Sequence, residues 1–192
     1  MLSKSGYAML WTAGPADDIL KRNRGVANIY RTEFDEMFGG MFSTHKTDNT
    51  VHSATVGGAS VELAFAPTDG VQQRIVNAVN TANSSIQIAM FTFTNDALGD
   101  ALIAAHARGV PVEVLLDGLS AGGVGGERDR LCANGITVRV ENFAGKIHDK
   151  YAVIDSGTAS DPLIVSGSTN WTASAVQAND ENLLIVHDDS RS

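Results

Sequence analysis

Apolar and polar positions follow two distinct patterns from residue 60 onward. Short runs rich in β-branched and aromatic residues, typical of strands, alternate with segments whose apolar residues recur every three or four positions, as in helices. Strands are predicted at 60–66, 85–93, 111–116, 136–140, 147–155, 163–166 and 181–186, and helices at 69–83, 95–108 and 127–134. This alternation predicts an α/β fold in which a mixed β-sheet is sandwiched by helices.

The N-terminal part of the chain has a different pattern. Residues 1–18 contain Gly, Pro and small side chains, which indicates loose order, whereas 19–38 have the apolar spacing of an amphipathic helix. Residues 41–59 are polar with little periodicity and are predicted to form a linker. The chain therefore divides into an N-terminal segment, 1–59, and a single domain, 60–192.

Composition narrows the class of protein. With 192 residues, of which 43% are hydrophobic and 19% charged, the chain is predicted to be globular with one core. The net charge of −8 argues against a protein that coats nucleic acid, although it does not exclude a nuclease, because the field in a cleft can differ from the net charge. The single cysteine, Cys132, is predicted to be a small buried helix residue.

No targeting or membrane-spanning segment is recognised. The longest apolar runs fall short of the ~20 residues that a membrane span needs, so no transmembrane segment is expected. The start of the chain has too short an apolar stretch for a clear signal peptide, which leaves the compartment open.

Candidate chemistry gathers between residues 146 and 170. His148, Lys150 and Asp155 follow the order H-x-K-x-x-x-x-D. Side chains on a strand alternate faces, so His148 and Lys150 are expected on one face and Asp155 on the other, where it would make a structural ion pair or turn contact. Ser168 and Asn170 are also two positions apart, and a neighbouring strand would bring them to the same place. An imidazole, an ammonium, a hydroxyl and an amide together suit a phosphate group.

The H-x-K-x4-D run followed by Gly167-Ser168-Thr169-Asn170 resembles the signature of the phospholipase D superfamily. The resemblance implies one phospholipase D-like repeat without its last helix, and a metal-independent phosphodiester hydrolase. His148 would attack phosphorus and form a phosphohistidine, while Lys150 and Asn170 hold the phosphate oxygens. Ser168 would be a further donor, and Glu181 matches a glutamate that buttresses the histidine in the family.

Other candidate sites are weaker. The glycine-rich run 120–126 lacks the Lys-Ser/Thr of a P-loop and is interpreted as a mobile loop near the substrate. His45 and His52 are interpreted as exposed loop histidines rather than metal ligands, and neither a metal nor another cofactor is expected. Phe91 and Phe93 are assigned to the core. For Trp171 two interpretations stay open, a core residue or part of a pocket wall.

A single histidine leaves the predicted site incomplete. The leaving oxygen needs a proton while the nucleophile stays unprotonated, so two poised groups are required. The family meets this need with two facing motifs, and we therefore expect a homodimer, or a second repeat, that brings two such histidines together. Helix 19–38 resembles the closing helix of a repeat in two-repeat bacterial relatives. It would fill the place of the missing helix in its own subunit or in its partner.

Two substrate classes and one non-enzymatic role stay open. The stretch 85–117 looks most like the endonuclease branch of the family, whereas the acidic charge favours a phospholipid over a nucleic acid. Alternatively, the chain is an inactive fragment of a two-repeat protein that serves as a binding or assembly module.

Overall fold

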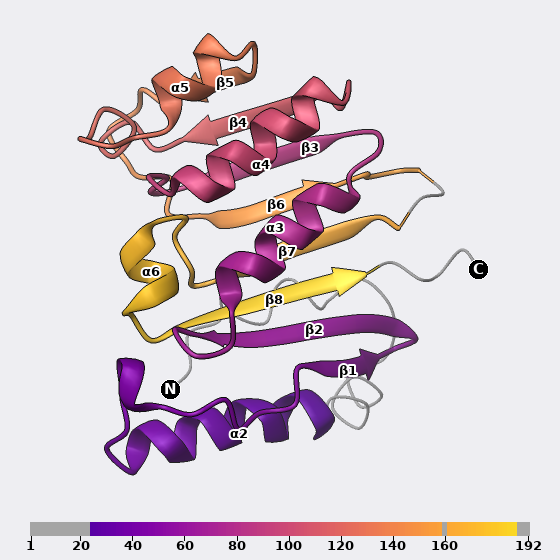
Figure 1. Cartoon of the computed structure of the whole chain (residues 1–192), viewed down its shortest axis with the longest axis vertical. Helices are drawn as coiled ribbons and strands as arrows, with labels where there is room; N and C mark the ends of the chain where they lie inside the picture. Colours follow the sequence, from indigo (N-terminus) through magenta and orange to yellow (C-terminus); the bar gives the residue numbers. More distant parts are fainter. Residues whose placement is uncertain (1–23, 159–160, 188–192) are drawn as a thin grey trace.

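The computed structural model of the protein describes residues 24–158 and 161–187. Its centre is an eight-stranded sheet with the spatial order β1-β2-β8-β7-β6-β3-β4-β5 (Figure 1). β3, β4 and β5 run parallel to one another, and the remaining neighbours are antiparallel. The strands are β1 Ser53–Val56, β2 Ala59–Ala66, β3 Ile86–Met90, β4 Val112–Leu116, β5 Thr137–Val140, β6 Lys150–Ile154, β7 Leu163–Gly167 and β8 Glu181–His187.

One face of the sheet carries the main core. Figure 1 shows α3 and α4 lying across this face. Alternate side chains of β3, such as Ile86, Ile88 and Met90, face these helices and are buried. The helices are α2 Arg24–Phe38, α3 Val71–Thr81, α4 Asp96–Ala107, α5 Arg128–Ala133 and α6 Ala173–Gln177, with a short 3-10 helix, η3, at Ser43–His45. None of these helices is long and apolar enough to cross a bilayer, within the ranges that the structure describes.

The opposite face is covered by α2 at one end of the sheet. Ile29 of α2 packs against Val61, Leu63 and Phe65 of β2, and the Tyr30 ring meets Phe65 edge-on at 5.2 Å. Ala64 and Ala66 of β2 belong to the main core instead, as the alternation of a strand requires. The predicted α/β sandwich is therefore confirmed, and α2 packs in cis against the sheet of its own chain.

Several boundaries differ from the sequence predictions. The expected linker 41–59 contains β1, because Gly57 and Gly58, both with positive φ, form a two-residue turn that folds β1 back onto β2. The helix predicted at 19–38 begins at Arg24 within the described residues, and 19–23 lie outside them. Cys132 is exposed on α5 and not buried as expected. This short helix packs against the core with the face that carries Leu131, and Cys132 lies outside that face. α6 was not predicted, since a helix of about one turn leaves no periodic signal.

Asp155 lies at the end of β6 and secures the turn that leads from α3 into β3. Its carboxylate is 1% exposed and accepts backbone N–H groups of Asn83, Ser84 and Ser85 at 2.7–3.1 Å. Burial alone would raise the pKa of Asp155, but these hydrogen bonds outweigh it and hold the pKa below the ordinary aspartate value. Asp155 is thus a structural acceptor at the opposite end of β6 from His148.

We expect Asp155→Asn to lower the free energy of unfolding at pH 7 by about 2 kcal/mol, because a charged acceptor for three backbone donors is lost. A lowered pKa in the folded state means that the ionised group stabilises the fold above its unfolded pKa. This contribution is lost as the pH falls through the folded pKa. The gap between variant and wild type, measured by urea unfolding, should therefore shrink below about pH 4. The exposed Asp129→Asn is the control, and a gap that is the same at all pH values would contradict this account.

Candidate functional site

The chain directions in the sheet bring the motif residues to one edge. β6 and β8 both run antiparallel to β7, so the starts of β6 and β8 lie beside the end of β7. Lys150 begins β6, Ser168 follows β7, and Glu181 begins β8. β3 and β4 also end here, since Met90 pairs with both Lys150 and Leu116. This row of strand ends, on the left in Figure 1, is called the motif edge below. The name refers to the ends of the strands and not to the outermost strands of the sheet.

His148 and Lys150 are in direct contact. The Lys150 Nζ atom lies 3.2 Å from His148 Nδ1 and donates to the His148 carbonyl oxygen at 2.9 Å. His148 lies just before β6 and not within the predicted strand 147–155. The ladder nevertheless extends past the strand, because the Phe91 N–H donates to the Asp149 carbonyl at 2.9 Å. The imidazole is therefore exposed on a held backbone, next to a half-buried ammonium.

Phe91 is a site residue that the sequence analysis assigned to the core. Its ring is half-buried and packs against the His148 ring, with centroids 4.6 Å apart. The ammonium groups of Lys150 and Lys146 lie 5.3 and 5.9 Å from its centroid, a geometry that attracts cations to the ring face. Strand parity gave only a partial signal: Phe91 shares the parity of the half-exposed Gln87 and not that of Ile86, Ile88 and Met90, but parity did not indicate its contact with His148.

Asn170 is fixed by the backbone beyond β3. The Thr92 N–H donates to Asn170 Oδ1 at 3.3 Å, which leaves the amide nitrogen as the free donor of this side chain. Trp171, the next residue, is 2% exposed and meets Phe93 edge-on at 5.1 Å. Trp171 is thus a core residue that anchors Asn170, which corrects the option of a pocket wall, and Phe93 lies in the core as expected.

Ser168 and Glu181 pair with each other. The Ser168 hydroxyl donates to Glu181 Oε2 and accepts from the Asn182 N–H at 3.0 Å. The expected hydrogen bond from the His148 ring to the Glu181 carboxylate does not occur among the described residues. The His148 ring contacts Lys150 instead. Glu181 still acts on the site through its charge: burial lowers the pKa of Lys150, while Glu181 and Asp149 raise it, and the net pKa is lowered.

Gly167, the glycine of the glycine-serine element, is required for the close packing of β7 against β8. Its φ is 147°, and a Cβ atom built there would lie 2.1 Å from the Asn182 carbonyl oxygen. Any larger residue would push β7 away from β8, since a side-chain carbon has no room at that distance. The glycine therefore permits the close approach that brings Ser168 to Glu181.

Asp117 is a supporting residue that the sequence analysis missed. It is fully buried at the end of β4, and Oδ1 accepts the N–H groups of Leu119 and Ser120 at 3.0 and 3.1 Å. Its Oδ2 accepts the N–H of Ile147, the residue before His148, at 3.1 Å. The Ser120 hydroxyl also donates to the Phe91 carbonyl. Asp117 thus joins the start of the glycine-rich loop to the histidine segment, and an acid directly after an apolar strand was the available signal.

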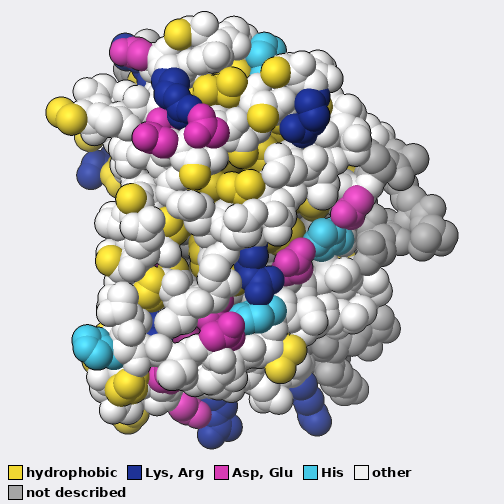
Figure 2. Space-filling model, in the orientation of Figure 1, with side chains coloured by type: hydrophobic (Ala, Val, Ile, Leu, Met, Phe, Trp, Pro, Cys, Tyr) yellow, Lys and Arg dark blue, Asp and Glu magenta, His cyan; other side chains and the backbone are white. Residues whose placement is uncertain are grey.

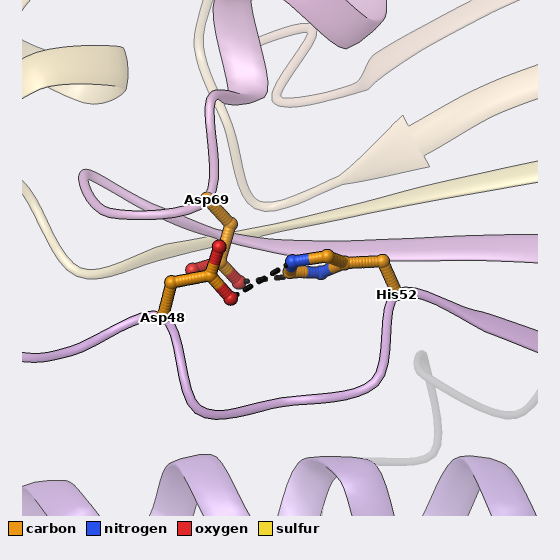
Figure 3. A group of neighbouring side chains, drawn as sticks. All are labelled: Asp48, His52 and Asp69. Carbon is orange, nitrogen blue, oxygen red and sulfur yellow. Dashed lines mark ion pairs between the residues drawn. The ribbon is translucent and has the colours of Figure 1, made fainter.

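A second group of polar side chains lies elsewhere in the fold (Figure 3). His52 is half-buried, contrary to the expected exposed position, with Nε2 2.9 Å from Asp48 and Nδ1 3.8 Å from Asp69 and 3.2 Å from the Leu63 carbonyl. The two carboxylates face different ring nitrogens, and Asp69 Oδ2 already accepts the Phe65 N–H at 2.8 Å. This geometry fits a hydrogen-bonded ion pair better than a shared metal ion.

Known proteins share this fold and this sequence pattern. The family model described as "Cardiolipin synthase, PLD-like domain" matches residues 75–191. The mitochondrial cardiolipin hydrolases of Chlamydomonas reinhardtii and Xenopus tropicalis are 34% and 36% identical over 66% and 63% of this chain. The alignments cover 54% and 55% of those proteins, so the chain spans about half of their length.

A solved structure agrees with the family match. Nuc from Salmonella typhimurium, described as a phospholipase D family member, superposes with a TM-score of 0.60 and 26% identity. The superposition covers 68% of this chain and 84% of Nuc. Since the family model spans well over half of the sequence and the fold agrees with it, the chain belongs to the phospholipase D-like family.

Proposed function

We propose that this protein is a phosphodiester hydrolase that works through a phosphohistidine at His148. The observation that carries the proposal is the contact of an exposed imidazole with an ammonium at the motif edge, where the Ser168 hydroxyl and the Asn170 amide follow the end of β7. These groups suit a bound phosphodiester, because three kinds of donor surround a nitrogen able to attack phosphorus.

The reaction has two steps at phosphorus. An unprotonated nitrogen of His148 forms a bond to phosphorus while the bond to one ester oxygen breaks, and that oxygen leaves with a proton from a general acid. Water then attacks the phosphohistidine, releases the phosphomonoester and restores the imidazole. Lys150 and the amide of Asn170 stabilise the charge on the non-bridging oxygens in both steps.

The contact between Lys150 and His148 has to open when substrate binds. An ammonium that donates to Nδ1 occupies the lone pair of that nitrogen, whereas an incoming phosphate offers Lys150 a stronger, charged acceptor. Nδ1 then needs another partner, and Glu181, which belongs to the same edge, is the carboxylate proposed to accept from it. Ser168, which now binds Glu181, becomes a donor for the substrate.

Charge at this edge supports catalysis without a metal ion. Lys150, Lys146 and a protonated second histidine supply the positive charge that a divalent cation supplies in other phosphodiesterases. We therefore propose that hydrolysis continues in EDTA.

The acid is proposed to be His148 of a second copy of the chain. His148 is exposed, and the loops after β4 and β5 present the exposed apolar side chains Leu119, Val124 and Phe143. Figure 2 shows hydrophobic side chains along this margin of the molecule. A two-fold partner would cover such side chains and bring the two imidazoles to one phosphate.

A phospholipid is the favoured substrate. The similar curated proteins are named cardiolipin hydrolases, and the net charge of −8 disfavours a polyanion. On the face in Figure 2, lysine and arginine side chains are scattered among acidic ones and form no continuous band. Release of phosphatidic acid from cardiolipin, compared with nicking of plasmid DNA in EDTA, tests the choice directly.

We expect His148→Asn to lower kcat/KM by about 10³-fold or more, because the nucleophile is lost while the shape of the side chain is nearly kept. Wild-type protein quenched in acid-free denaturant with ³²P-labelled substrate should carry label, and the variant should not. His106→Asn, on α4 and away from the motif edge, is the control. A folded wild-type protein without activity or label on any phosphodiester would favour the binding-module alternative.

The pH profile of kcat/KM should report Lys150. Its lowered pKa means that the ammonium is lost at a lower pH than for an ordinary lysine, so activity should fall on the alkaline side. Glu181 raises the pKa of Lys150, and Glu181→Gln should therefore shift the alkaline limb to lower pH. An unchanged or upward-shifted limb would contradict the assignment.

Mixed assemblies should reveal a shared site. If one site needs His148 from both copies, co-refolding equal amounts of wild type and His148→Asn should leave roughly one quarter of the wild-type activity, since only wild-type pairs are competent. Independent sites would leave roughly one half. Sedimentation under the assay conditions should show the dimer, and a fully active monomer would exclude a shared site.

A further inference from the structure

A buried lysine connects the N-terminal segment to the motif edge. The Lys46 side chain is 0% exposed, yet it carries a charged nitrogen. That nitrogen bonds Glu33 of α2, the carbonyl of Ala66 at the end of β2 at 2.8 Å, and Asp180 at 3.1 Å. Asp180 directly precedes Glu181, so the lysine fixes the point from which β8 starts.

Two neighbouring contacts hold the same point. The Ser43 N–H donates to Asp180 Oδ1 at 2.9 Å, and the Ser43 hydroxyl donates to the Ala178 carbonyl at 2.6 Å. The segment that follows α2 therefore binds residues 178–180 through the backbone and hydroxyl of Ser43 as well as through Lys46.

A second connection runs from α2 to the serine of the motif. The Asn182 amide nitrogen donates to the Tyr30 hydroxyl at 2.7 Å. The other end of the same amide, Oδ1, accepts the Ser168 N–H at 2.8 Å. Tyr30 thus sets the orientation of Asn182, and Asn182 sets the position of Ser168.

A contribution to the stability of the fold is not enough to account for these contacts. Burying an ammonium with carboxylates costs desolvation that the ion pair often only balances, whereas such groups can fix one arrangement among several. Burial raises the pKa of Glu33. Burial would lower the pKa of Lys46, but the hydrogen bonds from Lys46 to Glu33 and Asp180 raise it. Tyr30, Glu33 and Lys46 also precede residue 75, where the family match begins.

We propose that residues 24–46 form a brace that positions Glu181 and Ser168 for the reaction at His148, with Lys46 and Tyr30 as its positioning residues. The role of the brace in catalysis rests on the proposed function, whereas its hold on β8 does not. The brace touches no substrate. It acts by fixing where β8 starts and where the motif serine lies, and displacement of a catalytic group by about 1 Å can cost up to ~100-fold in rate.

The test uses substitutions that keep size and remove one contact each. Asp180→Asn weakens the bond to Lys46, and Tyr30→Phe removes the hydroxyl that Asn182 needs while the ring still packs on Phe65. His187→Gln, which breaks ion pairs at the opposite end of β8, is the matched control.

Hydrogen exchange is the readout that does not depend on activity. In Asp180→Asn and Tyr30→Phe, amide exchange in peptides covering 167–170 and 180–184 should accelerate by about 10-fold, because their anchoring bonds are weakened. Peptides from β4 should be unchanged, and His187→Gln should leave 167–170 unchanged. Exchange at wild-type rates in both brace variants would overturn the brace, whether or not the protein is an enzyme.

Activity then tests whether the brace acts through Glu181. Asp180→Asn should lower kcat/KM by about 10- to 100-fold at a temperature where the variant is fully folded. In a Glu181→Gln background the same substitution should cost less than about 2-fold, since the group it positions is already gone. Equal losses in both backgrounds would overturn positioning through Glu181. Faster exchange in a protein that hydrolyses no phosphodiester would support the structural hold while rejecting the proposed function.

Discussion

Antiparallel pairing of β6, β7 and β8 is the constraint on which the motif edge depends. Because each strand reverses direction, residues that are far apart in sequence, from Lys150 to Glu181, reach the same edge of the sheet. Gly167 makes the pairing close enough, since its missing Cβ leaves room for the Asn182 carbonyl. A sheet with a parallel β7 would place the serine and the lysine at opposite edges.

The rest of the structure can be understood as support for this edge. At the far end of β6, Asp155 accepts hydrogen bonds from the turn before β3. Asp117 accepts a hydrogen bond from the segment before His148. Trp171 anchors Asn170 from within the core. Each support is buried or nearly so, whereas His148 is exposed. This division suits the proposed exchange, in which Lys150 leaves His148 and binds a phosphate.

Sequence patterns predicted the elements that repeat and missed those that depend on distant contacts. The strand pattern of β3 and β6 and the helical spacing of α3 and α4 were sufficient to predict the sheet and its helices, and the structure confirms both. β1 has too few residues for periodicity and was recognisable only from the Gly57-Gly58 turn. Spacing in the motif predicted that His148 and Lys150 lie together, because side chains two positions apart in an extended segment share a face. Lys46 could not be predicted, since lysine is rarely buried and its partner Asp180 is remote in sequence.

The packing of α2 on β2 also bears on where the folding unit begins. A chain cut at residue 60 would leave Val61, Leu63 and Phe65 facing water, and the loss of β1 would turn β2 into an open edge strand, which invites aggregation. The stretch that carries the recognisable motif is therefore smaller than the piece of chain able to bury its own apolar surface. Expression trials that begin at residue 60 should be expected to yield insoluble material, and those that keep α2 should not.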